Sequence, residues 1–185
     1  MSTNTASIAP ASSFVAGSAC PASVVETAHD LSRKLAERAA EIDQNDRFVT
    51  ENYALLKEAG LVEAGVPREL GGGGAEIPEL AEMLRVLARA CGSTALAFSM
   101  HTHQVAIPAW RWRHQKVAAV EPLLKRIAAE KIILLSSGGS DWIGGSGKAE
   151  RDGDGYRITA RKVFTSGAEA GDILMTGAIH EGEDG

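Results

Sequence analysis

The sequence is poor in cysteine and aromatic residues and has no long apolar run, although 44% of its 185 residues are hydrophobic. Its two cysteines, Cys20 and Cys91, cannot build a disulfide framework and do not form a C-x-x-C pair. No apolar run approaches the roughly 20 residues that a membrane-spanning helix requires. The N-terminus has no basic start followed by an apolar stretch, as a secretory signal would. These absences predict a soluble, cytoplasmic protein with no membrane partner.

An excess of basic charge is also missing. The 19 Lys and Arg residues are outnumbered by 24 Asp and Glu residues, which gives a formal net charge of −5. Proteins that bind nucleic acids usually carry a basic excess to neutralise phosphates. The run from Trp110 to His114 alternates aromatic and basic residues, but one short cluster in an acidic chain is more typical of a helix entry with partly buried tryptophans. We predict no nucleic-acid partner.

Two familiar catalytic motifs are incomplete. Gly147-Lys148 resembles the end of a phosphate-binding P-loop, but that motif needs Gly and Ser or Thr where Trp142 and Ala149 stand. Ser140 and Ser146 both lack the second glycine of the G-x-S-x-G elbow of serine hydrolases. The sequence therefore supports neither a P-loop nucleotidase nor a serine hydrolase.

A metal site is not indicated either. His101 and His103 are two residues apart, so on a helix they point in roughly opposite directions and cannot chelate one ion. No other group of histidines and carboxylates completes a ligand set. We predict no metal cofactor.

Apolar residues recur at helical spacing over the first two thirds of the chain. The pattern predicts five helices, over about 24–43, 46–59, 77–91, 94–106 and 114–130. We expect the fourth to end before Pro108, because proline disfavours helical backbone at the residue before it. Residues 1–22 are small, polar and without periodicity, which predicts a disordered leader.

The pattern changes at Lys131. We expect strands at 131–135 and 172–179, a Ser- and Gly-rich loop up to Gly147, and a hairpin with arms 148–151 and 156–163 around Asp-Gly-Asp-Gly. So small a sheet leaves an exposed edge, which is unfavourable for an independent domain. We therefore expect the chain to be one piece of a larger protein.

The segments, in their order, resemble the acyl-CoA dehydrogenase family of flavoproteins. The turn VPRELGGGG at 66–74 is similar to the family's P-E-E-Y-G-G-x-G, and RDGDGY with KVFTS to its D-G-D-G-Y and K-x-F/W-I-T/S. Further matching segments are NYALLKEAGL at 52–61, LARACGS at 87–93, AFSMH at 97–101, HQK at 114–116, LL at 123–124 and EKI at 130–132. The agreement spans roughly residues 46–179, and its order carries more weight than any single motif.

The resemblance implies an α+β fold. We expect an N-terminal α-helical domain over 23–130 after the leader 1–22, and a partial antiparallel β-domain over 131–185. The family's C-terminal helical bundle would then be absent from these residues. In dehydrogenases of the family that bundle supplies the catalytic base and most of the oligomer interface, so no catalytic residue is assigned here, and a homo-oligomer is expected of the complete protein.

The resemblance also implies a flavin, FAD or alternatively FMN, between the two domains. The segment Leu135–Asp141 takes the place of the family's T-E-P-G-A-G-S-D, with Ser137 and Gly138 instead of Glu and Pro. The flavin-binding residues implied are Leu135, Ser136, Ser140, Phe164, Thr165 and Ser166, and the substrate-binding residues are Ser140 and His101. A hydroxyl near the ring's carbonyl or N5 would stabilise the charge of reduced flavin.

Three functions remain open. The first is α,β-dehydrogenation of an acyl-CoA thioester, with hydride transfer to flavin and an electron-acceptor flavoprotein as partner. The second is monooxygenation, because KVFTSGA at 162–168 is similar to the K-x-F-C-S-G-A of the family's monooxygenase branch, which receives reduced flavin from a flavin reductase. The third is a non-catalytic binding or assembly fragment.

Overall fold

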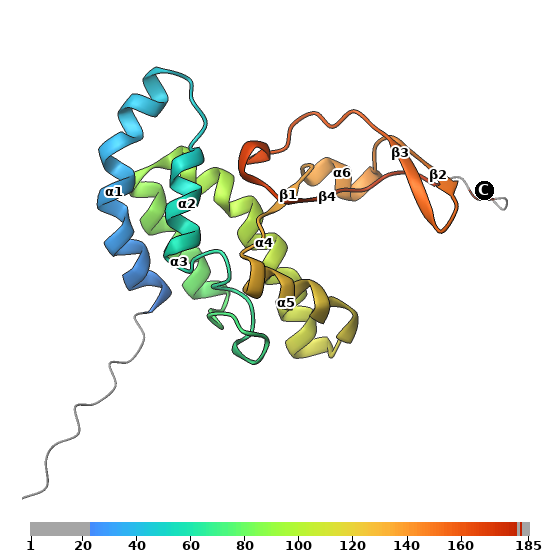
Figure 1. The fold of residues 1–185 in the computed structure, drawn as a ribbon, viewed down its shortest axis with the longest axis horizontal. Helices are drawn as coiled ribbons and strands as arrows, with labels where there is room; N and C mark the ends of the chain where they lie inside the picture. Colours follow the sequence, from blue (N-terminus) through green and yellow to red (C-terminus); the bar gives the residue numbers. More distant parts are fainter. Residues whose placement is uncertain (1–22, 181, 183–185) are drawn as a thin grey trace, which may run out of the picture.

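The computed structural model describes residues 23–180 and residue 182, so the leader predicted at 1–22 lies outside the described residues. Five helices form one body, and a smaller region with short strands extends from one end of it (Figure 1). This order, a helical part followed by a small β part, confirms the α+β class that the sequence predicts.

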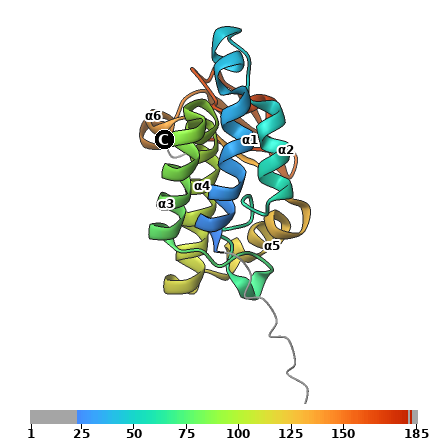
Figure 2. The ribbon, with the colours of Figure 1, turned by 90° about the vertical axis from the view of Figure 1, so that its left-hand side faces the viewer.

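The first helix, α1 (Val24–Gln44), begins at a reciprocal cap. The Glu26 backbone N–H donates to the Ser23 hydroxyl at 3.2 Å, and the Ser23 N–H donates to the Glu26 carboxylate at 2.7 Å. The buried face of α1 lies against α3 (Ile77–Ala90), which is capped in the same manner by Glu76 and Glu79; Figure 2 shows the two helices side by side.

The second helix, α2 (Thr50–Glu58), is shorter than predicted at both ends. Asp46 adopts a left-handed conformation with φ of 49°, which interrupts the chain between α1 and α2. Tyr53 and Leu56 on α2 are buried, and the Tyr53 ring meets Phe98 edge to face at 6.1 Å between centroids. This contact fixes α2 against the long central helix.

That central helix, α4 (Gly92–Gln115), corrects two predictions. It continues through Pro108, and it contains His114, from which the sequence predicted a new helix. Burial on both sides of the proline explains the continuation, because Val105 and Ala109 both lie in the core. The following helix is α5 (Glu121–Glu130), which the Trp112 indole N–H joins to α4 by donating to the Glu121 carboxylate at 3.1 Å.

The glycine-rich turn before α3 folds back tightly on the segment before it. The Gly73 N–H donates to Glu63 O at 3.0 Å, and the Gly74 N–H donates to Val66 O at 2.8 Å. At Gly72 a β-carbon would lie 2.3 Å from Val66 Cβ and 2.4 Å from Val66 O. Glycine is therefore required at position 72 by the close approach of two backbone segments.

Two strand pairs form the β part. The predicted hairpin is confirmed as β2 (Lys148–Asp152) and β3 (Gly155–Thr159), paired antiparallel. However, β1 (Leu134–Ser136) and β4 (Ile173–Met175) pair in parallel, so the β part is not antiparallel throughout. The chain between them contains the short helix α6 (Gly139–Gly144), where the sequence predicted only a loop.

The two parts share one core. Residues 132–135 are buried with the side chains of the helices, and α4 lies against β1. Among the residues that the structure describes, no helix has the length and apolar character needed to cross a membrane.

We expect Gly72→Ala to lower the free energy of unfolding by at least about 2 kcal/mol, because the new methyl group meets backbone atoms that cannot move aside. Urea unfolding measures this change. Gly92→Ala is the matched control, since no atom lies within 4 Å of its β-carbon position at the start of α4. The control is expected to be neutral or slightly stabilising, and equal losses in both variants would contradict the assignment.

Candidate functional site

The two segments predicted to hold flavin lie side by side. The Phe164 ring lies close to Gly138, where a β-carbon would be 3.3 Å from its Cε2 atom. The Leu135 side chain lies against Gly167 and Gly171, at 3.5 Å and 2.2 Å from their β-carbon positions. The end of β1 and the turn at 164–167 therefore form one continuous surface.

The residues at the end of β1 are buried. The Leu135 side chain is covered by the two glycines, so only its backbone could meet a cofactor. The Ser136 hydroxyl is also buried and accepts a 3.4 Å hydrogen bond from the Gly138 N–H. Ser140 lies in α6, and its side chain is outside the described residues.

The turn at 164–167 places an exposed ring next to hydroxyl groups. Phe164 is 65% exposed, whereas Thr165 and Ser166 are half-buried. Gly167 has φ of 85° and approaches the Tyr53 hydroxyl, to 2.9 Å from its β-carbon position, so the turn is fixed against α2. A flat aromatic face beside hydroxyls and a glycine-lined strand end fits a planar heterocycle such as flavin.

His101 has a different place from the one predicted. Its ring is 1% exposed and stacks on Phe98, with 5.3 Å between ring centroids. Its Nδ1 atom accepts from the Leu134 N–H at 2.9 Å, so Nε2 carries the proton and donates to Val62 O, also at 2.9 Å. Both nitrogens are used by backbone groups, which gives His101 a structural role in place of the predicted contact with substrate. Burial lowers the pKa of His101 to about 4.

A buried ion pair joins the two segments that are predicted to hold flavin. The Lys162 ammonium is 2.8 Å from Asp141 Oδ1, and the side chains are 12% and 4% exposed. Hydrogen bonds from Lys162 and from the hydroxyls of Ser137 and Ser146 hold the pKa of Asp141 far below its usual range. Asp141 and Lys162 were not predicted as site residues, although each stands in one of the two segments that the resemblance assigns to flavin. Their opposite charges in these two segments are the signal that could have identified them.

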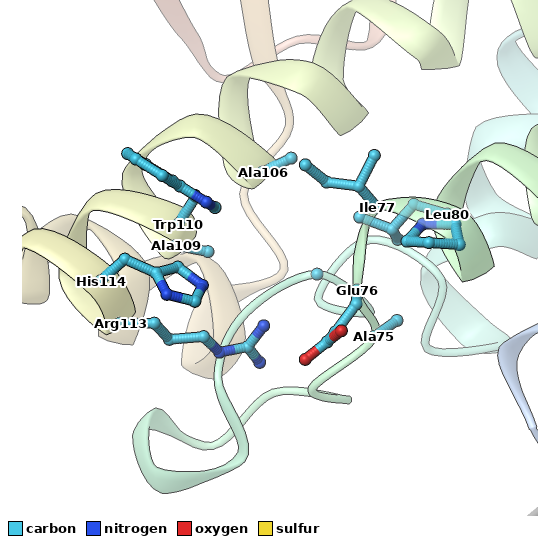
Figure 3. A pocket seen from close by; sticks show the side chains of 11 residues that line it. Ala75, Glu76, Ile77, Leu80, Ala106, Ala109, Trp110, Arg113 and His114 are labelled. Atoms are coloured by element: carbon cyan, nitrogen blue, oxygen red, sulfur yellow. The ribbon is translucent and has the colours of Figure 1, made fainter.

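Two hollows lie between α3 and α4, away from the β part. An apolar groove of about 300 Å³ is lined by residues that include Leu84, Ser99, Met100 and His103. Next to it is a cavity of about 210 Å³, in which the side chains of Glu76 and Arg113 approach one opening beside Trp110 and His114 (Figure 3). Within residues 23–180, no group of three or more His, Cys, Asp or Glu side chains is arranged to hold a metal ion.

The helical part followed by two short strand pairs defines an α+β fold. The profile of the acyl-CoA dehydrogenase N-terminal domain matches residues 22–126. The chain therefore belongs to the acyl-CoA dehydrogenase family.

Its relatives include both dehydrogenases and monooxygenases. The chain is 31% identical over 174 residues to dibenzothiophene monooxygenase of Mycolicibacterium goodii, with 85% of this chain and 39% of the relative covered. It is 29% identical over 167 residues to the probable acyl-CoA dehydrogenase YngJ of Bacillus subtilis strain 168, with 88% and 44% covered. The chain thus spans about four tenths of the length of these relatives.

Solved structures show the same fold. KijD3 in complex with FMN and a dTDP-amino-keto sugar superposes with a TM-score of 0.74 at 28% identity, covering 90% of this chain and 43% of that one. The nitrososynthase of Micromonospora carbonacea var. africana gives 0.75 at 27% identity, covering 88% and 42%.

We expect the free energy of unfolding to decrease as the pH falls, because the buried His101 ring resists protonation. The folded-state pKa of about 4 lies below the ordinary 6.5, so between these values the unfolded chain takes up a proton that the folded chain does not. The free energy of unfolding should therefore drop by about 2 kcal/mol from pH 7 to pH 5 on account of this residue.

Urea unfolding at the two pH values, in the wild type and in His101→Gln, isolates this contribution. The variant is expected to be less stable at pH 7 but to lose about 2 kcal/mol less on acidification. NMR titration of the His101 ring gives the same answer directly. A midpoint near 6.5 would contradict the buried neutral ring.

Proposed function

We propose that this chain forms the flavin-binding part of an oxidoreductase whose reaction is α,β-dehydrogenation of an acyl-CoA thioester. The observation that carries the proposal is the contact of the 65%-exposed Phe164 with the strand end at Gly138. The exposed ring offers a face for stacking, and the neighbouring hydroxyls suit a planar, hydrogen-bonding partner.

Each residue of this surface has a separate task. Phe164 stacks on the flavin ring, and the Ser166 hydroxyl donates a hydrogen bond to the ring's polar edge. Ser136, Thr165 and the backbone of Leu135 hold the ring's other polar atoms, and Ser140 is assigned to the phosphate end and the adjoining substrate. When bound, flavin supplies two-electron transfer, and the chain's own residues orient the ring and stabilise its charge. We propose FAD as the flavin, with FMN as the alternative.

The substrate is proposed to bind beside the flavin, where the family resemblance assigns Ser140 to it. The complete protein is proposed to act as a homo-oligomer and to pass electrons to an acceptor flavoprotein.

A second candidate function is monooxygenation with reduced flavin from a partner reductase. The specific observation is the segment Lys162–Ala168, whose resemblance to the monooxygenase branch includes the αL glycine at position 167. Several relatives support the same candidate, among them the oxygenase component of p-hydroxyphenylacetate 3-hydroxylase from Acinetobacter baumannii, 38% identical over 88 residues.

We expect Phe164→Ala to weaken flavin binding about 10-fold, because stacking on an aromatic ring is worth roughly 1–3 kcal/mol. Flavin fluorescence titration of the natural-length protein measures the dissociation constant. Tyr156→Ala is the matched control, since Tyr156 is a half-exposed aromatic residue on the hairpin, outside the proposed site. Equal flavin affinity in the wild type and in Phe164→Ala would show that Phe164 does not contact the flavin.

The dependence of turnover on oxygen distinguishes dehydrogenation from monooxygenation. Under anaerobic conditions with an artificial electron acceptor, acyl-CoA-dependent reduction of the acceptor should persist for a dehydrogenase. A monooxygenase should instead consume substrate only when oxygen and reduced flavin are both supplied. Turnover in neither assay by a flavin-loaded protein would leave a binding or assembly role.

A further inference from the structure

We infer that the ion pair between Asp141 and Lys162 is a positioning device that locks the two flavin-holding segments together. The inference rests on the proposed function, since it concerns the same site. Neither side chain is assigned a contact with the flavin; both act through the segments that they join.

Asp141 is the meeting point of three stretches of chain. Its carboxylate accepts from the Ser137 hydroxyl at 2.5 Å, directly after β1, and from the Ser146 hydroxyl at 2.5 Å, before β2. It also accepts from the Thr176 hydroxyl at 2.9 Å and from the Gly177 N–H at 3.2 Å, both after β4. The carboxylate therefore joins the ends of both parallel strands.

Lys162 adds the fourth stretch, which leads to the exposed ring. Its ammonium donates to Asp141 Oδ1 at 2.8 Å and Oδ2 at 2.9 Å, and also to Ser146 O at 2.8 Å and Gly177 O at 2.5 Å. Phe164 is only two residues farther along the chain. The segments that carry Ser136 and Phe164 are thus held to each other through one buried salt bridge.

The consequences of breaking the pair follow from its burial. Loss of the lysine charge leaves a buried carboxylate with no counter-charge, and the surrounding chain must open to hydrate it. Opening displaces residues on both sides of the flavin surface, because both ends of the pair are attached there. Removal of both charges avoids this penalty, so the double variant should be less impaired than the lysine variant.

The test uses the natural-length protein with Lys162→Met, Asp141→Asn and the double variant. Lys125→Met is the matched control, because it removes a lysine from an exposed ion pair with Glu121 on α5. The first readout is amide hydrogen exchange of the flavin-free protein. In Lys162→Met, exchange should accelerate at least 10-fold in both segments, 134–138 and 162–168, and remain unchanged in the control.

The second readout is flavin binding. We expect the dissociation constant to rise at least 10-fold in Lys162→Met, with a shifted flavin absorption spectrum, and to recover at least 3-fold in the double variant. If Lys162→Met does not fold, Ser146→Ala serves instead, since Ser146 contacts both members of the pair. In Ser146→Ala, we expect amide exchange in both segments to accelerate about 3-fold and the flavin dissociation constant to rise about 3-fold.

The outcomes separate the two proposals. Unchanged flavin affinity and spectrum in folded variants that have only a lower melting temperature would reduce the pair to a stabilising contact and overturn the inference. Exchange that accelerates in only one segment would also overturn it. If the wild type binds no flavin, the proposed function fails. Faster exchange of both segments in Lys162→Met would still show that the ion pair holds the two segments together.

Discussion

The arrangement of this molecule depends on the two hydrogen bonds of His101. One ring nitrogen receives the Leu134 N–H and the other donates to Val62 O, while the ring itself stacks on Phe98. The side chain therefore joins the central helix, the turn after α2 and the first strand through a single buried group. Because β1 leads directly into the proposed flavin surface, His101 helps to position that surface relative to α4.

The β part is held by a contrasting interaction. His101 is neutral and satisfies backbone groups, whereas Asp141 and Lys162 are charged and satisfy each other. A neutral contact deep in the helical core costs little desolvation, while a charged pair requires full hydrogen bonding around it. The five groups that donate to Asp141 meet this requirement.

Local sequence predicted the elements that local forces determine. The helix over 24–43 and the Asp-Gly-Asp-Gly hairpin were predicted because periodicity and turn residues act within a few positions of the chain. The continuation of α4 through Pro108 was not, because it depends on core contacts that override the local preference of proline. The parallel pairing of β1 with β4 and the position of Asp141 depend on contacts between distant segments, and no spacing in the sequence encodes these directly. The family resemblance assigned 135–141 and 162–168 to one cofactor, and the structure shows that these two segments lie side by side.

The pairing of β1 with β4 has a consequence for how the protein folds. Leu134 and Ile173 are separated by almost forty positions, and the helix α6 and the whole hairpin lie between them. Closing a loop of this length costs on the order of 3 kcal/mol of chain entropy before any strand contact is gained. Each helix forms from hydrogen bonds within single turns, so the helices can form before β1 meets its partner. The surface at Gly138 and Phe164 forms only when this loop is closed, so a ligand that touches both of its sides would offset part of the entropy cost of forming its own site.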